Sequence, residues 1–89
     1  MPYARGEKEV NPEKIKEDVI DIICEIGTLN PREIHDHTTL DQLGLDSLDI
    51  TEISMEIENL YEINLDEISI AELKDHTLQS IINIIEEKI

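Results

Sequence analysis

The chain has 89 residues, which is one small domain, and a chain of this length buries only roughly 60–65% of its unfolded surface. Its 22 acidic residues outnumber 7 Lys and Arg, and the net charge of −15 argues against nucleic acid or an anionic membrane as a partner. No apolar run approaches the length of about 18 residues that suggests a membrane span. A single cysteine, Cys24, excludes an internal disulfide and fits a reducing compartment. We therefore expect a cytoplasmic protein without membrane insertion.

The N-terminal segment and the first helix are predicted from the positions of Pro, Gly and cap residues and from the spacing of apolar residues. Residues 1–10 contain Pro, Gly and mixed charges, so we expect a disordered lead-in, with a single domain over residues 11–89. A first helix is expected to begin at Pro12, with Asn11 as its cap, and to stop at Gly27. Its apolar residues recur at helical spacing, and the cysteine within them is expected to be buried: Ile15, Val19, Ile22, Ile23, Cys24 and Ile26.

The rest of the chain predicts three more helices. Residues 28–46 form a long irregular stretch, and loops of this length in small domains are usually functional. A second helix is expected over residues 47–61, a short third over 70–74, and a last helix after Thr77. Seventeen isoleucines would favour strands, but their spacing of three and four favours helices. The predicted fold is therefore all-α, a small four-helix bundle with a long first loop and a short third helix.

The second helix has two distinct apolar faces on a helical wheel. Leu48 and Met55 fall nearly opposite the expected core face, with Thr51 between them, and carboxylates flank them. Exposed apolar side chains within a charged rim are typical of a surface that contacts another protein. The residues expected on the core face are Ile50, Ile53, Ile57, Leu60 and Tyr61.

The first residue of that helix is a serine, Ser47, in the run LGLDSLDITE over residues 43–52. The run is not a Gly-x-Ser-x-Gly elbow and shows no oxyanion hole, so we expect no catalytic residue and no enzyme activity. Histidines at 35, 37 and 76, with Asp36, could suggest a metal site, but His-x-His without cysteine is weak, and we expect no metal. Ser47 then offers either an exposed attachment point or a plain helix cap.

Residues 11–89 closely resemble the acyl carrier proteins, which are four-helix bundles with a long first loop. The strongest match is GLDSLD, residues 44–49, which is similar to the family's Asp-Ser-Leu site for a prosthetic group. Met55, the acidic residues after it, the run YEI over residues 61–63 and the short third helix follow the family's order. The resemblance is specific because the sequence run, the exposed apolar face of the second helix, the net negative charge and the chain length all agree with it.

The resemblance implies that Ser47 receives 4′-phosphopantetheine from coenzyme A through a phosphopantetheinyl transferase, and that the arm carries acyl groups as thioesters. It implies a monomer that docks on basic patches of synthases and acyltransferases and can bury an acyl chain among its helices. The residues at positions matching the family's contacts are Asp46, Leu48, Asp49, Glu52, Met55 and Glu56.

Two departures bear on the kind of carrier. Thr51 stands where these proteins usually have Val or Ile, and Leu65 stands where Pro commonly follows Glu-Ile. They leave the carrier role intact but weaken an assignment as the housekeeping fatty-acid carrier. We expect a carrier for fatty-acid or related lipid or polyketide synthesis. The alternatives are an aminoacyl or peptidyl carrier, or an acidic helical adaptor without an arm.

Overall fold

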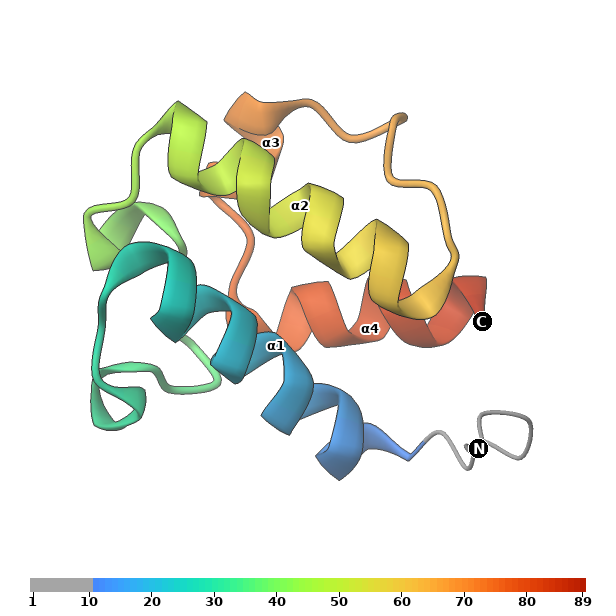
Figure 1. Cartoon of the computed structure of the whole chain (residues 1–89), viewed down its shortest axis with the longest axis horizontal. Helices are drawn as coiled ribbons and strands as arrows, with labels where there is room; N and C mark the ends of the chain where they lie inside the picture. Colours follow the sequence, from blue (N-terminus) through green and yellow to red (C-terminus); the bar gives the residue numbers. More distant parts are fainter. Residues whose placement is uncertain (1–10) are drawn as a thin grey trace.

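A computed structural model describes residues 11–89, and the expected lead-in over residues 1–10 lies outside them. Within the described range the chain has four α-helices and no named strand, which confirms the all-α prediction (Figure 1). The helices are α1 (Pro12–Gly27), α2 (Ser47–Tyr61), α3 (Ile70–Lys74) and α4 (Leu78–Lys88), and two 3₁₀ turns, η2 (Pro31–Glu33) and η3 (Asp41–Leu43), lie in the long first loop.

α1 begins and ends at the predicted residues, and its start is capped as predicted. The Asn11 side chain accepts a hydrogen bond from the Lys14 N–H at 2.8 Å, and Pro12 is the first helical residue. Gly27 lies within the helix, and the left-handed residue that stops it is Thr28, at φ 55°. Glycine is the usual left-handed residue just after a helix, but here Thr28 has that conformation and Gly27 is the last helical residue.

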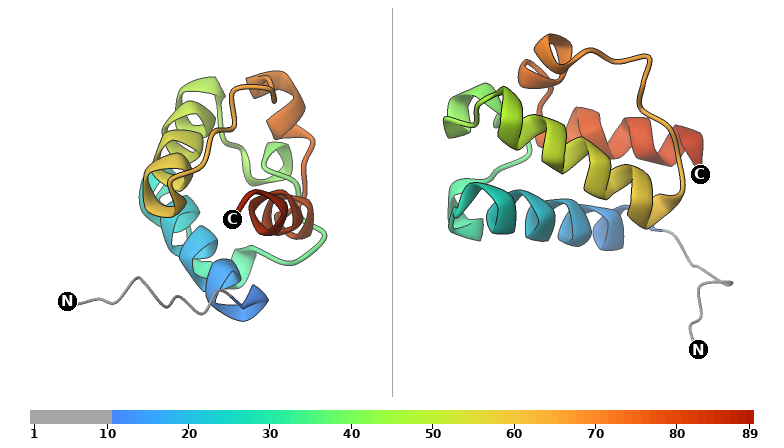
Figure 2. Two further views of the ribbon diagram at one scale, coloured as in Figure 1. Left: turned by 90° about the vertical axis from the view of Figure 1, so that its right-hand side faces the viewer. Right: turned by 45° about the horizontal axis from the view of Figure 1, so that its top comes forward.

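Fifteen aliphatic side chains form the core of residues 11–89, and no polar or charged residue is buried there. Each long helix contributes a stripe at a spacing of three or four residues, such as Ile15, Val19 and Ile23 on α1. α1 contacts both α2 and α4, and the short α3 packs on α2 (Figure 2). None of the helices in this part of the chain is long and apolar enough to cross a membrane.

Two apolar residues lie differently from the prediction. Leu60 was expected in the core but is 48% exposed, because it lies at the edge of the apolar stripe in the last turn of α2. Cys24 is half-buried beside the core rather than enclosed by it. Burial and the neighbouring carboxylates Asp21 and Glu33 raise the pKa of the Cys24 thiol. The thiol therefore stays protonated and weakly nucleophilic at neutral pH.

The long first loop is fastened to the start of α4. Thr39 and Thr77 form an isolated antiparallel bridge, and the Leu78 N–H donates to the Thr38 carbonyl at 3.1 Å. An ion pair of 2.8 Å between Lys16 and Asp36 ties the same loop to α1 and lowers the pKa of the Asp36 carboxyl. The loop also buries three aliphatic side chains, Ile34, Leu40 and Leu45. The segment before α2 is thus held from several sides.

Thr28→Gly should stabilise the protein by about 0.5–1 kcal/mol, because a β-branched residue is strained in the left-handed region whereas glycine is not. The measurement is urea unfolding followed by circular dichroism. The matched control is Thr77→Gly, since Thr77 has an extended backbone and its hydroxyl caps α4 by accepting from the Ser80 N–H. The control should lose stability. Unchanged or reduced stability in Thr28→Gly would contradict the inferred strain.

A partly buried hydrogen bond should make the stability depend on pH in the alkaline range. The Tyr61 hydroxyl donates to Asp18 Oδ2 at 2.9 Å, joining α2 to α1. Burial, and then this bond and the Asp18 charge, raise the Tyr61 pKa above its ordinary value of 10.0. Above that value the unfolded chain loses a proton that the folded chain keeps, so the contribution is present below about pH 10 and declines as the pH rises.

The free energy of unfolding should therefore fall more steeply in the wild type than in Tyr61→Phe between about pH 9 and 11. Urea unfolding across this range measures both slopes, and titration of the lysines contributes equally to each. Parallel slopes would mean that the Tyr61 hydroxyl is not held by Asp18 in solution.

Candidate functional site

The first turn of α2 is built by a reciprocal cap between two aspartates. The Asp49 N–H donates to Asp46 Oδ1 at 2.9 Å, and the Asp46 N–H donates to Asp49 Oδ2 at 3.4 Å. This capping box decides the alternative that the sequence left open, because Asp46 and not Ser47 is the cap. Ser47 is the first helical residue, and its side chain is not needed to begin the helix.

Ser47 is exposed, and within residues 11–89 its hydroxyl makes no hydrogen bond. In the same range the backbone N–H groups of Ser47 and Leu48 also have no protein acceptor. Free N–H groups at the positive end of a helix dipole attract an anion. The site therefore combines a free alcohol with two donors suited to a phosphate attached to it, so it fits a phosphodiester-linked group.

The exposed face of α2 follows directly from this serine. Leu48 is 70% exposed and Met55 is 54% exposed, as the helical wheel predicts. Thr51 lies between them, and its hydroxyl donates to the Ser47 carbonyl at 2.8 Å. Threonine commonly bonds back to the carbonyl one turn earlier, so the polar group of Thr51 is satisfied by its own helix. The polar residue therefore interrupts the apolar face less than its sequence suggests.

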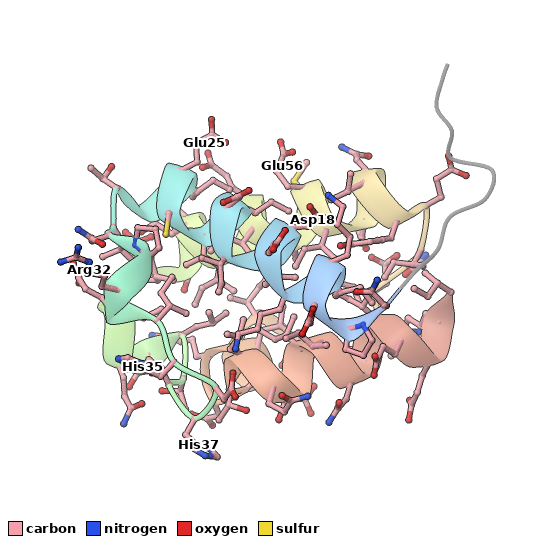
Figure 3. All side chains as sticks on the ribbon, turned by 90° about the horizontal axis from the view of Figure 1, so that it is seen from below. Asp18, Glu25, Arg32, His35, His37 and Glu56 are labelled. Atoms are coloured by element: carbon pink, nitrogen blue, oxygen red, sulfur yellow. The ribbon has the colours of Figure 1, made fainter. Side chains whose placement is uncertain are left out.

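The carboxylates around this face are mostly free of cations. Glu52 and Glu56 are exposed, whereas Asp49 is half-buried and shared with the cap. In the described part of the chain the lysine ion pairs involve other acids, so the carboxylates around this face have no cationic partner. These pairs are Lys14–Asp18, Lys16–Asp36, Lys74–Asp41 and Lys88–Glu67. Figure 3 shows Glu56 of α2 and Glu25 of α1 projecting from the same side of the bundle.

Glu58, another carboxylate of α2, does not lie free on the rim of the exposed face. It is half-buried, and its Oε2 accepts the Leu65 N–H at 2.8 Å. This bond joins α2 to the segment that leads to α3. Glu58 therefore shapes the connection behind the helix, and the acidic rim is formed by the residues on the other side.

An apolar cavity of about 10 Å³ lies between α2, α3 and α4. That volume is close to a single water molecule, so the side chains around it are nearly closed on one another. Ser54 is the one polar residue in its lining, and its hydroxyl donates to the Thr51 carbonyl at 2.8 Å. The aliphatic lining includes Leu40, Ile53, Ile57, Leu73, Ile81 and Ile85.

The histidines do not converge on one another. His35 and His37 are exposed on the first loop, and His37 points outward in Figure 3. His76 lies beyond α3 with its Nδ1 2.9 Å from the Glu72 carbonyl oxygen. Across residues 11–89 there is no group of three or more His, Cys, Asp or Glu placed to hold a metal ion.

Comparison with known proteins agrees with this geometry. Residues 17–85, which include Ser47 and most of all four helices, match the family described as "Phosphopantetheine attachment site". The chain is also 31% identical to the acyl carrier protein of Amoebophilus asiaticus (strain 5a2) over 77 residues, which cover 85% of this chain and 94% of that protein. The chain belongs to the acyl carrier protein family, whose members bear covalent 4′-phosphopantetheine.

A second relative is much larger. Clavatol synthase claF of Penicillium crustosum is 34% identical over 61 residues, which are 68% of this chain but only 2% of that synthase. The similarity therefore concerns one short segment of the synthase and says nothing about the remainder of it.

Proposed function

We propose that Ser47 is the residue that carries the 4′-phosphopantetheine arm. The observation that supports this is the separation of roles at the start of α2, where Asp46 caps the helix and the neighbouring hydroxyl is exposed and unbonded. Ser54 and Ser80 are half-buried, and the hydroxyls of Ser54, Ser69 and Ser80 all take part in hydrogen bonds. Among the serines of residues 11–89, Ser47 alone offers a free nucleophilic oxygen at the start of a long helix.

In the proposed modification the Ser47 Oγ forms a bond to the phosphorus of the phosphopantetheine part of coenzyme A. The phosphoanhydride bond breaks, adenosine bisphosphate leaves, and the serine proton passes to a base. The carboxylates of Asp46 and Asp49 are engaged with backbone N–H groups, so the base and the Mg²⁺ come from a separate transferase. The attached arm supplies a terminal thiol that carries acyl groups as thioesters. We therefore propose a carrier and not a catalyst.

The cargo we propose is an acyl chain of fatty-acid, related lipid or polyketide synthesis, in preference to an aminoacyl or peptidyl group. The support is the cavity between α2, α3 and α4, whose lining is aliphatic apart from Ser54. An aliphatic lining favours an alkyl chain and disfavours a charged amino group, which would be costly to desolvate there. The acidic face of α2 agrees with this choice. We propose that the protein acts as a cytoplasmic monomer.

The modification should add one arm to the protein and only at Ser47. Incubation with coenzyme A, Mg²⁺ and a phosphopantetheinyl transferase should raise the intact mass by one arm, and Ser47→Ala should abolish the rise while keeping the helical circular dichroism. The matched control is Ser54→Ala, on the same helix, which should still be modified. An arm on another serine, or no arm under conditions that modify a reference carrier, would refute the assignment.

We propose that the exposed face of α2 is where partner enzymes dock. Leu48 and Met55 supply the apolar centre, and Asp46, Glu52 and Glu56 supply the charged rim. The region from residue 33 to residue 73 has twelve acidic residues and no Lys or Arg, so its field is not neutralised locally. Such a field speeds encounter with a basic surface and is screened by salt. The partners we propose are transferases, synthases and acyltransferases with Arg- and Lys-rich patches.

The effects of charge and of apolar burial on docking at this face should differ in their dependence on salt concentration. Glu52→Lys should raise the KM of the transferase for the carrier by about tenfold at low salt, and the defect should shrink as salt rises. Met55→Ala should raise KM with little salt dependence, because its contribution is buried apolar area. Glu86→Lys makes the same change of charge on α4 and should have a much smaller effect. Unfolding of Met55→Ala would show that this side chain is core.

A further inference from the structure

The last residue of α1 packs against the residue that precedes the cap of α2. A Cβ placed on Gly27 would lie 2.7 Å from Leu45 Cδ2 and 3.2 Å from Leu29 Cδ1, whereas ordinary carbon contacts begin at 3.4 Å. Two leucine side chains thus fill the space where any other residue would have its Cβ. In Figure 1 the end of α1 lies beside the loop that leads into α2.

Gly27 is required for space and not for backbone conformation. The glycine with a left-handed φ of 78° is Gly44, and a Cβ there would meet nothing within 4 Å. Gly27 lies in the helix, where alanine is the better helix former and would be favoured if the space allowed it. Gly44 is therefore needed for the backbone conformation of a turn, whereas Gly27 is needed for a close side-chain contact.

Leu45 connects this contact to the attachment site. It is only 4% exposed, so it has little room to rotate away from a new methyl group. The next residue is Asp46, whose side chain caps α2, and Ser47 follows directly. A displacement of Leu45 would therefore be passed through one residue, Asp46, to the serine.

We propose that Gly27 is a positioning residue for attachment of the prosthetic group: the absence of its side chain seats Leu45, and Leu45 sets where the Ser47 hydroxyl stands. The proposal rests on Ser47 being the attachment site. It adds that a residue twenty positions earlier, on a different helix and without contact to the serine, controls how readily that hydroxyl reacts.

Gly27→Ala should lower the kcat of phosphopantetheinyl transfer by about tenfold, because small misplacements of a reacting group are costly. The KM for the carrier should stay within about twofold, since the docking face of α2 is unaltered. This pattern is the reverse of that expected for Glu52→Lys. A loss of stability alone would not produce it, because the folded fraction measured by circular dichroism corrects the carrier concentration.

Leu45→Val provides the decisive second variant, because it removes about the volume that Gly27→Ala adds. Alone, Leu45→Val should lower kcat about threefold, because the smaller side chain leaves a gap beside Gly27. The combination of Gly27→Ala with Leu45→Val should recover kcat to within about twofold of the wild type. Gly27→Ala then lowers kcat in the wild-type background and raises it in the Leu45→Val background. A general destabilisation at position 27 would lower kcat in both backgrounds.

The outcomes separate this proposal from the one on which it depends. If the wild type is not modified at Ser47, the assignment of the attachment site is wrong. If the wild type is modified and folded Gly27→Ala reacts with unchanged kcat, the positioning role is wrong. Should Gly27→Ala fail to fold, the double variant decides, because a kcat no higher than that of Leu45→Val alone overturns the proposal.

Discussion

The aliphatic core between α1, α2 and α4 is the constraint on which the rest of the molecule depends. It contains fifteen buried aliphatic residues and, within residues 11–89, no buried polar group. A chain with a net charge of −15 meets strong self-repulsion in a compact state, and apolar burial has to offset it. Because the core needs no charge, none of the acidic residues within residues 11–89 is buried, and the exposed carboxylates of α2 are the ones that we propose to meet a basic partner.

Most of the helical architecture could be predicted from the sequence, because an amphipathic helix repeats its apolar residues locally. α2 and α3 have the bounds that spacing and caps indicate, and Leu48 and Met55 face the solvent as the wheel predicts. Ser47 was found from the run around it. Whether Ser47 caps the helix is not decided by the sequence, since serine and aspartate are both good caps and only the geometry of the first turn distinguishes Ser47 from Asp46.

The features that could not be predicted depend on contacts between residues distant in the chain. The bridge of Thr39 with Thr77 and the bond of Glu58 to Leu65 have no local pattern. Leu60 was misplaced because a wheel treats each turn of a helix alike, although cover by neighbouring elements varies along it. The sequence predicts the end of α1 at Gly27, but the packing of this glycine on Leu45 is visible only in three dimensions.

The cap of α2 has a consequence for how the carrier presents itself through a cycle of loading and release. The hydrogen bonds that begin the helix run between Asp46 and Asp49, and none of them involves the Ser47 hydroxyl. A group added to that hydroxyl leaves every one of these bonds in place. On the proposal that Ser47 bears the arm, an enzyme therefore meets the same first turn of α2 in the carrier with and without the arm, and it must distinguish these two forms by the arm itself.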